Sequence, residues 1–334
     1  MKIISLIILN FIIIFFINKF RLIISEKTKL VDIPDNIRKF HRTNTPLLGG
    51  IMIYSTFLFL NLYLYLFNEY NKVNLIILIA SSCCFLIGLF DDVFKISYRY
   101  KFLFLTLFFS FFLTLEPNLQ LTKIYFLTFN KFIYLDDYSI FFTVICLLLL
   151  SNAINLIDGI NGLCIIISLI IFTWMQLTFE NINFFYVVIA SLILILFLNL
   201  RNNIFLGDSG SLFLGSIIGL LLINSYNNEI LITNFPVEDI FIVLMFPGVD
   251  MLRVFIIRII KRKNPFSSDR NHLHHLLQDK KLELYKTLTI ILALYLSPIL
   301  INFFTKFEPL FIILSFILVY TIAILIIKKN SRLI

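Results

Sequence analysis

Long apolar segments recur along the whole chain and are separated by short polar loops. A segment of roughly 20 apolar residues is long enough to cross the ~30 Å hydrocarbon core of a bilayer as a helix. Only 14% of the 334 residues are charged, whereas soluble domains contain about 25%. The sequence therefore predicts an all-α polytopic membrane protein with about 10 or 11 transmembrane helices, forming one domain over residues 1–334. The eleven candidate segments begin near Ile3, Leu48, Asn74, Phe102, Ile140, Leu163, Phe184, Leu212, Ile240, Thr287 and Leu310.

The distribution of basic residues predicts the orientation of these helices. Lys and Arg in short loops favour the cytoplasmic side of a membrane. With the N-terminus outside, only five of the 28 Lys and Arg residues lie outside, which predicts an N-out, C-in topology. Residues Leu119–Leu135 alternate apolar and polar in places and predict an outer β-hairpin or an interfacial segment rather than a span. The net charge of +8 does not predict a nucleic-acid partner, because the chain contains no soluble basic domain.

Polar motifs collect on the predicted inner face. The acids of the outer face, such as Asp136 and Glu238, are scattered and lack such partners. This asymmetry predicts one functional site at the cytoplasmic boundary of the membrane. The five motifs are Pro34–Gly50, Gly88–Lys101, Asn152–Leu163, Phe205–Gly215 and Ser267–Leu277.

Asp91 and Asp92 end the third apolar segment, and Lys101 follows them. The helix dipole disfavours anions at this end, by about 0.3–1 kcal/mol. Consecutive helical residues point about 100° apart. Solvated acids at the end of a span are the structural alternative, but the pair better suits two neighbouring tasks than chelation of one ion.

Asn152, Asn155 and Asp158 recur every three residues and share one face if the segment is helical. Amide and carboxylate oxygens suit a hard cation such as Mg²⁺, which also binds substrate phosphates. The alternative is an ordinary polar helix end.

Asp208 lies in the sequence Gly-Asp-Ser-Gly, where an apolar helix begins. Its carboxylate suits an N-cap, and it retains lone pairs for a metal ion. Ser209 is not predicted to be a protease-like nucleophile, because such a site needs separately placed His and Asp partners.

Histidines form the last motif, and one ion pair is predicted within the ninth apolar segment. His272, His274 and His275 with Arg270 predict a donor-rich patch for phosphate. A zinc site with a distant acid and a solvated basic loop are the alternatives. Asp250 and Arg253 lie one helical turn apart and are expected to pair, because an unpaired ion inside the membrane costs about 2.5–3.5 kcal/mol.

Carboxylates and amides for Mg²⁺, combined with Lys, Arg and His for phosphate oxygens, indicate a phosphoryl-transfer site. Its place at the membrane boundary predicts one lipid substrate and one cytoplasmic nucleotide substrate. No Walker A loop is present, which argues against a pump driven by ATP hydrolysis.

The chain resembles the polyprenyl-phosphate N-acetylhexosamine-1-phosphate transferases over roughly residues 34–277. Each motif alone is weak, whereas five motifs in the order of the family form a specific pattern. The motifs that carry the resemblance are Pro34…Arg38-Lys39…His41…Pro46…Gly49-Gly50, Asp91-Asp92…Lys101, Asn152-Ala-Ile-Asn-Leu-Ile-Asp-Gly, Gly207-Asp-Ser-Gly-Ser211 and Asp269-Arg-Asn-His-Leu-His-His275.

The resemblance implies transfer of N-acetylhexosamine 1-phosphate, with GlcNAc favoured, from a UDP-sugar to polyprenyl phosphate, with release of UMP. It implies that Asp91 deprotonates or positions the lipid phosphate and that Asp92 assists at the diphosphate. Lys39 and Lys101 would hold phosphate oxygens.

The resemblance also assigns the metal and nucleotide ligands. Asn155 and Asp208 would carry Mg²⁺, or Mn²⁺ in its place, and Asp158 would orient the nucleotide. Asn152 and Asn161 would contact the nucleotide sugar. The diphosphate or sugar would be bound by Arg270, His272, His274 and His275.

The sequence departs from the family at Asn161, where many members have a second Asp. An amide cannot act there as a carboxylate base or an anionic metal ligand. Related enzymes are often homodimers, although no residue of this chain predicts one. The resemblance implies a multi-pass protein of the bacterial cytoplasmic membrane that initiates a lipid-linked surface glycan. The alternatives are the phospho-N-acetylmuramoyl-pentapeptide transferase of peptidoglycan synthesis, a lipid-phosphate phosphatase and an ion-coupled transporter.

Overall fold

The computed structural model describes residues 2–33, 44–67, 71–179, 184–230, 235–264, 270–305 and 307–329. These residues form two compact units. The first comprises Met1–Gln120 and Thr143–Ser225, and the second comprises Leu121–Phe142 and Tyr226–Ile334.

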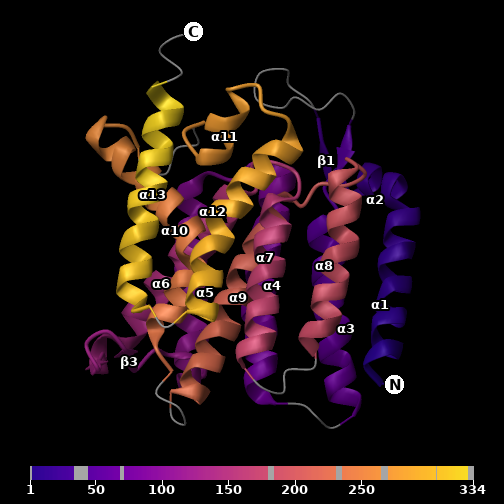
Figure 1. Cartoon of the computed structure of the whole chain (residues 1–334). Helices are drawn as coiled ribbons and strands as arrows, with labels where there is room; N and C mark the ends of the chain where they lie inside the picture. Colours follow the sequence, from indigo (N-terminus) through magenta and orange to yellow (C-terminus); the bar gives the residue numbers. More distant parts are fainter. Residues whose placement is uncertain are drawn as a thin grey trace. The chain divides into compact units, whose positions relative to one another are not determined.

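The first unit is a bundle of helices (Figure 1). Helix α8 packs against α1, α3 and α7, and α4 packs against α3 and α5. A two-stranded antiparallel ladder of β1 (Val31–Asp32) and β2 (Thr45–Pro46) leads into α3. The helices are α1 (Lys2–Lys19), α2 (Arg21–Thr28), α3 (Gly49–Leu66), α4 (Lys72–Phe94), α5 (Tyr98–Leu115), most of α6 (Ser139–Ile157), α7 (Leu163–Thr178), α8 (Phe184–Leu200) and most of α9 (Gly207–Glu229), with the short 3-10 helix η1 (Pro117–Leu119).

The second unit packs α10 (Val237–Ile260), α12 (Leu284–Phe304) and α13 (Pro309–Lys329) against one another. The short helix α11 (Leu273–Gln278) lies against α12 and α13, near the upper ends of these helices in Figure 1. Strands β3 (Lys123–Phe126) and β4 (Lys131–Tyr134) pair antiparallel, and the 3-10 helix η2 (Asp136–Tyr138) follows them. The predicted β-hairpin is therefore confirmed.

Specific contacts fix this hairpin within the second unit. The Tyr226 hydroxyl accepts a hydrogen bond from the backbone N–H of Tyr125 (2.9 Å). The carboxylate of Glu238 accepts the N–H groups of Leu127 and Thr128 in the hairpin turn, each at 3.1 Å. One of the acids that seemed scattered in the sequence therefore has a structural role.

The eleven apolar segments correspond to helices α1, α3 to α10, α12 and α13. Among the described residues, eight helices are long and apolar enough to cross a membrane, or nine if the bent pair α1–α2 is one span. Helices α7 and α8 are apolar but shorter, with 16 and 17 residues. The prediction of an all-α polytopic membrane protein is confirmed.

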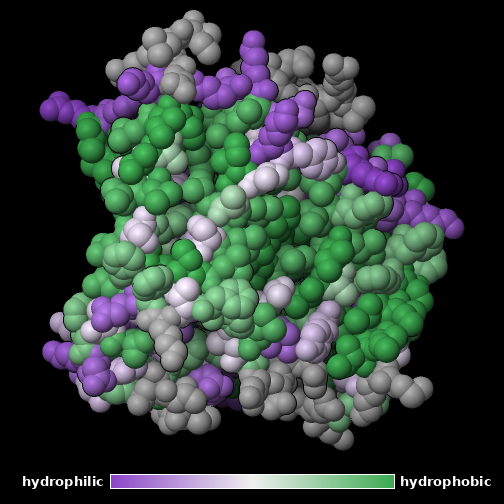
Figure 2. Space-filling view, viewed as in Figure 1, coloured by the Kyte–Doolittle hydropathy of each residue, from purple (hydrophilic) through white to green (hydrophobic). Residues whose placement is uncertain are grey.

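Large hydrophobic side chains remain exposed on the outward faces of these helices, for example Phe104 on α5 and Phe311 and Leu318 on α13. Figure 2 shows broad areas of hydrophobic residues on the visible surface. Water would disfavour such large apolar areas, whereas the hydrocarbon core of a bilayer accommodates them.

Candidate active site

The last turn of α4 lies against the first turn of α9, which begins at Gly207. The two carboxylate oxygens of Asp92 accept the backbone N–H groups of Asp208 (2.9 Å) and Ser209 (3.1 Å). The first N–H groups of a helix have no acceptor within that helix. Asp92 therefore caps α9 from another helix. The positive end of the α9 dipole offsets the unfavourable place of Asp92 at the negative end of α4.

Two glycines allow the close approach of α4 and α9. A Cβ atom at Gly88 would overlap the carbonyl oxygen of Asp208 and the Cα of Ser209. Gly207 has a φ of +75°, and a Cβ there would lie 2.7 Å from Oδ2 of Asp92. The small residues of these motifs are thus required by the packing that brings Asp92 to the first turn of α9.

Lys101 on α5 bridges two carboxylates. Its Nζ lies 2.9 Å from Oδ2 of Asp91 and 2.6 Å from Oδ2 of Asp208. The Asp208 side chain is 33% exposed, against 11% for Asp91, so Asp208 is the more accessible of the two acids. The expected N-cap role of Asp208 is wrong, because Asp92 caps α9 and the Asp208 carboxylate pairs with Lys101 instead.

The end of α6 supplies Asn155 and Asp158. Asn155 donates from Nδ2 to Oγ of Ser211 (2.8 Å), and its amide interacts with the Asp208 carboxylate. The predicted common helical face is only partly formed, because α6 ends at Ile157 and Asp158 lies in the following turn. The helix does not continue through this segment, where Gly162 adopts a φ of +85°.

The environment of Asp158 shows that negative charge is in excess at this site. Burial raises the pKa of the Asp158 carboxyl well above its usual range, and the carboxylates of Asp208 and Asp92 raise it further by repulsion. Among the described residues, four acids therefore interact at one site that contains a single ammonium group, Lys101. We call this set, consisting of Asp91, Asp92, Lys101, Asn155, Asp158 and Asp208, the acid site.

Other predicted ligands of the first unit have different positions. Asn161 donates to Oδ1 of Asn202 (2.6 Å), which connects the turn before α7 to the loop before α9. Asn199 supports the same connection by accepting the N–H of Gly162 (2.6 Å). Asn152 lies on α6, one turn before Asn155. Lys39 lies outside the described residues.

The second unit holds a separate polar cluster around Asp250 of α10. Arg253 donates from Nη2 to Oδ1 of Asp250 (2.8 Å), which confirms the predicted ion pair. His272 Nδ1 lies 2.7 Å from Oδ2 of Asp250. The rings of His272 and His274 are nearly parallel with centroids 5.8 Å apart, and His275 lies next to His274. We call this set, consisting of Asp250, Arg253, Arg270, His272, His274 and His275, the histidine site.

The histidine site contains polar atoms that lack hydrogen bonds. Nε2 of His272, Nε2 of His274 and Nδ1 of His275 are all buried without a partner. Burial lowers the pKa of His274 well below its usual range, and it also lowers that of His275, which Arg270 lowers further. Arg270 itself pairs with Asp279 (2.9 Å). The site therefore presents buried imidazole nitrogens with unused hydrogen-bonding capacity.

Neither cluster forms a metal cage by itself. Within the part of the chain that the structure describes, no three His, Cys, Asp or Glu side chains are placed to ligate one ion. A zinc site made by the histidines is therefore not formed among these residues. The acid site does have the hard oxygen donors that Mg²⁺ prefers, and Mg²⁺ commonly uses one or two carboxylates with substrate phosphates and waters.

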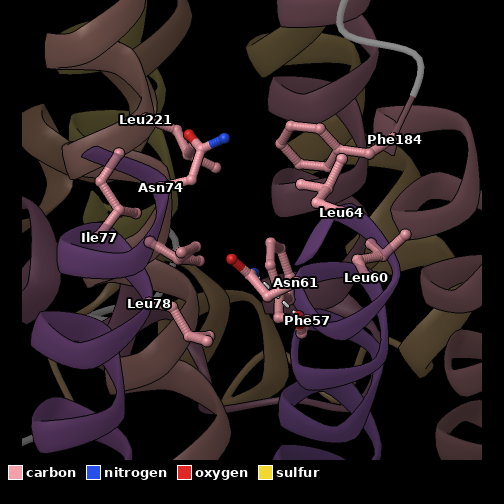
Figure 3. Close-up of a pocket in the computed structure, with 10 residues that line it drawn as sticks. Phe57, Leu60, Asn61, Leu64, Asn74, Ile77, Leu78, Phe184 and Leu221 are labelled. Carbon is pink, nitrogen blue, oxygen red and sulfur yellow. Dashed lines mark hydrogen bonds between the residues drawn. The ribbon is translucent and has the colours of Figure 1, made fainter. Parts of the chain in front are cut away.

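A small pocket lies elsewhere in the first unit. Its volume is about 20 Å³, enough for about one water molecule. Figure 3 shows the Asn61 and Asn74 amides among apolar side chains from α3, α4, α8 and α9. Ile77, in its wall, lies about 21 Å along α4 from Asp91 at 1.5 Å per residue. This pocket is too small for a nucleotide sugar and is distinct from the acid site.

Three contributors to these sites were not predicted from the sequence. Ser211 accepts the Asn155 amide, Asn202 pairs with Asn161, and the Tyr320 hydroxyl donates to Asp250. Ser211 belongs to the motif Gly207-Asp-Ser-Gly-Ser211, so the sequence pattern could have indicated it. Tyr320 lies in the last apolar helix, 70 residues after Asp250, and no local pattern distinguishes it.

Known proteins with similar sequences indicate the family of this chain. Residues 74–226 match the family described as glycosyl transferase family 4. The undecaprenyl-phosphate alpha-N-acetylglucosaminyl 1-phosphate transferase of Thermotoga maritima is 30% identical over 317 residues, covering 93% of this chain and 94% of the relative. The enzyme of that name from Escherichia coli K12 is 28% identical, covering 76% and 70%. A probable undecaprenyl-phosphate N-acetylglucosaminyl 1-phosphate transferase of Bacillus subtilis is 30% identical, covering 75% and 70%.

These findings define the class of the protein as a polytopic membrane enzyme that transfers a phosphoglycosyl group. The chain belongs to the polyprenyl-phosphate N-acetylhexosamine-1-phosphate transferases of glycosyl transferase family 4.

Proposed function

We propose that this enzyme transfers GlcNAc 1-phosphate from UDP-GlcNAc to undecaprenyl phosphate. A phosphate oxygen of the lipid forms a bond to the β-phosphorus of UDP-GlcNAc. The bond from that phosphorus to the bridging oxygen breaks, and UMP leaves with the electron pair. The products are undecaprenyl-diphosphate-GlcNAc and UMP. The names of the relatives support the transferred group and the lipid.

The observation that carries the proposal is the charge balance of the acid site. Asp91, Asp92, Asp158 and Asp208 interact around one ammonium group, that of Lys101. Such a site favours a cation, and a bound cation in turn favours phosphate oxygens. Mg²⁺ fits this donor set, and Asp208 and Asn155 are the residues that would hold it. When bound, Mg²⁺ neutralises developing charge on phosphoryl oxygens.

The remaining residues of the acid site take the roles that the family resemblance implies. Asp91 is held by Lys101 and is buried, so it positions the lipid phosphate or accepts its proton. Lys101 provides a positive charge for phosphate oxygens when its ammonium group separates from the carboxylate of Asp91 or Asp208. Asp158, in the turn after α6, orients the nucleotide. Asp92 already uses both oxygens to cap α9, so its suggested part at the diphosphate requires the loss of a capping bond.

The histidine site supplies the second substrate contact in this proposal. Its unpartnered imidazole nitrogens provide hydrogen bonds for the diphosphate or the sugar of UDP-GlcNAc. An unpaired buried polar atom costs about 1–3 kcal/mol, so binding a polar ligand there is favourable. Lys39, outside the described residues, is assigned to phosphate oxygens by resemblance alone.

We further propose that the enzyme lies in the bacterial cytoplasmic membrane with both polar sites toward the cytoplasm. The concentration of Lys and Arg in the loops of that side supports this orientation. The product would then begin a lipid-linked surface glycan.

The test is UMP formation by purified enzyme in detergent, with undecaprenyl phosphate, Mg²⁺ and a panel of UDP-sugars. UMP from UDP-GlcNAc that depends on the lipid and on Mg²⁺, and is restored by Mg²⁺ or Mn²⁺ after chelation, is the expected result. Turnover of UDP-N-acetylmuramoyl-pentapeptide instead would place the enzyme in the peptidoglycan branch. Release of phosphate from the lipid without a UDP-sugar would indicate a phosphatase. Folded protein that yields no UMP from any donor would contradict the proposal and favour a transporter.

A matched pair of variants tests the acid site. Asp208→Asn keeps the shape of the side chain but removes the charge, and it is expected to abolish UMP formation. Asp137→Asn makes the same change at an exposed acid of η2 and should leave turnover unchanged. Equal turnover in both variants would remove Asp208 from the proposed metal site.

A further inference from the structure

The carboxylate of Asp250 accepts hydrogen bonds from three groups of the second unit and lies within hydrogen-bonding distance of a fourth. Oδ1 accepts Nη2 of Arg253 (2.8 Å), the backbone N–H of Leu273 (3.1 Å) and the hydroxyl of Tyr320. Oδ2 lies 2.7 Å from Nδ1 of His272. The Asp250 side chain is only 1% exposed. Elements α10, α11 and α13 are thus joined at one buried acid.

This set of donors fixes the proton on the His272 ring. The guanidinium, the backbone N–H and the tyrosine hydroxyl all donate, so the Asp250 carboxylate acts as an ionised acceptor. An ionised carboxylate can only accept a hydrogen bond from Nδ1. The proton of a neutral His272 ring must therefore lie on Nδ1, and Nε2 is left with a lone pair.

The nitrogen that this arrangement presents is buried and unused. The His272 side chain is 3% exposed, and its Nε2 has no hydrogen-bond partner. The parallel ring of His274 also ends in a buried, unpartnered Nε2. The network thus holds His272 rigidly while leaving its outer nitrogen without a bond.

We propose that Asp250, held by Tyr320 and Arg253, is a positioning residue that fixes His272 with the proton on Nδ1, so that Nε2 accepts a hydrogen bond from the donor substrate. The group recognised is then an uncharged donor, an O–H or N–H of the sugar nucleotide, and not a phosphate oxygen. The identity of this substrate rests on the proposed function, whereas the state of the ring does not.

The first experiment reads the ring directly. The chain contains only four histidines, so ¹⁵N-histidine labelling of the full-length protein gives few signals, and His272→Gln assigns the one of interest. The chemical shifts of the two ring nitrogens distinguish Nδ1–H from Nε2–H and from the doubly protonated ring. We expect Nδ1–H for His272 at neutral pH. A proton on Nε2, alone or together with one on Nδ1, would overturn the proposal.

A matched pair of tyrosine variants tests the positioning. Tyr320→Phe removes the hydroxyl that donates to Asp250. Tyr295→Phe removes an equally buried hydroxyl of the same unit, which donates to the Val243 carbonyl (3.0 Å) and not to the network. We expect Tyr320→Phe to shift the His272 signals toward the Nε2–H form, and Tyr295→Phe to leave them unchanged. Identical spectra for both variants would overturn the role of Tyr320.

Kinetics provide a readout that a general loss of stability does not reproduce. Tyr320→Phe is expected to raise KM for UDP-GlcNAc by about tenfold, the loss equivalent to one hydrogen bond, with kcat and KM for the lipid nearly unchanged. Asp250→Ala should have the larger effect, and Asp250→Asn, whose amide oxygen can still accept Nδ1–H, should restore part of the affinity. Equal KM in Tyr320→Phe and Tyr295→Phe would contradict the proposal. Absence of turnover in wild type would refute the proposed function instead, and the spectra would still decide the state of His272.

Discussion

The acid site of the first unit and the histidine site of the second have different charge balances. The acid site contains four carboxylates and one ammonium group. The histidine site contains one carboxylate, the guanidinium that balances it, three imidazoles and Arg270, which is paired with Asp279. The first therefore favours a cation and the second favours a ligand with hydrogen-bonding groups. Under the proposed function, the two sites would contact different parts of the substrates.

The two sites also share one structural device. Asp92 accepts backbone N–H groups at the start of α9, and Asp250 accepts the N–H of Leu273 at the start of α11. In both cases an acid from one helix satisfies the first turn of another. The two sites differ in the side chain that lies next to the capped turn. At α9 this side chain is the carboxylate of Asp208, which is one-third exposed, whereas at α11 it is the buried ring of His272. Capping by a distant acid thus orders a partly exposed ligand in one unit and a buried one in the other.

The largest effect is expected from a variant that changes the charge balance of the acid site. Lys101→Met removes the single ammonium group between Asp91 and Asp208. Turnover should fall on the order of 10²–10³-fold, as is typical when one group that stabilises transition-state charge is lost. Affinity for Mg²⁺ should not fall, because the site becomes more negative. UMP release and Mn²⁺ binding measured on the same preparation separate the two effects.

The control for this variant is Lys286→Met, which removes an exposed lysine of α12. It should change neither turnover nor metal binding. A loss of metal affinity in Lys101→Met would show that the lysine orders the acids rather than opposing their charge.

A pair of glycine variants compares the packing of the two units, at the contact between α4 and α9 in the first and in α10 of the second. Gly88→Ala places a methyl group onto the backbone of Asp208 and Ser209, and overpacking of this kind costs about 1–3 kcal/mol. Gly248→Ala in α10 meets no atom within 4 Å and should stabilise the helix by about 0.5–1 kcal/mol. Thermal unfolding in detergent should therefore show a lower Tm for the first variant and a higher Tm for the second. Equal changes would mean that α4 and α9 separate without cost.

These packing constraints explain what the sequence could and could not predict. Apolar length located eleven of the thirteen α-helices formed by the described residues, missing the short helices α2 and α11, and residue alternation located the hairpin, because both signals depend on neighbours in sequence. The pair of Asp250 and Arg253, one turn apart, was predictable for the same reason. The N-cap of α9 was not, since a local rule assigns it to Asp208, whereas Asp92 lies 116 residues from that amide.

The same contrast between local and distant interactions applies to the candidate site. Motif order predicted which acids belong together, and the structure brings Asp91, Lys101, Asn155 and Asp208 into one place. The position of Asp158 outside α6 depends on a glycine-rich turn that a three-residue spacing does not reveal. Tyr320 could not be found at all, because a tyrosine in an apolar helix is an ordinary core residue unless its distant acceptor is known.

A smaller effect concerns the cap of α9. Asp92→Ala removes both acceptors, and loss of a helix cap costs about 0.5–2 kcal/mol. Asp92→Asn keeps one acceptor oxygen but places an NH2 group at the position of the other, so it should retain more of the stability than Asp92→Ala but less than wild type. Hydrogen exchange of a peptide spanning residues 205–213 reports on the capped amides directly. The fastest exchange is expected in the alanine variant. If the asparagine variant exchanges slowly yet releases no UMP, the charge of Asp92 has a chemical role as well.

The smallest effect is a pH dependence of opposite sign at the two sites. The folded-state pKa of Asp158 is raised, so the folded protein holds a proton that the unfolded chain has lost above about pH 3.9. Asp158 therefore contributes less stability as pH rises toward its folded pKa. The folded-state pKa of His274 is lowered, so the unfolded chain takes up a proton below about pH 6.5 that the folded protein excludes. His274 therefore reduces stability as pH falls.

Two variants measure these contributions separately. Asp158→Asn should raise Tm relative to wild type at pH 8, and this gain should shrink as pH falls. His274→Asn lacks the acid-side penalty, so its Tm relative to wild type should rise as pH falls from 7 to 5. The two difference curves should thus have opposite slopes over the same interval. Parallel slopes would mean that the two sites share one electrostatic environment, and the contrast between an acid site that favours cations and a neutral histidine site would no longer hold.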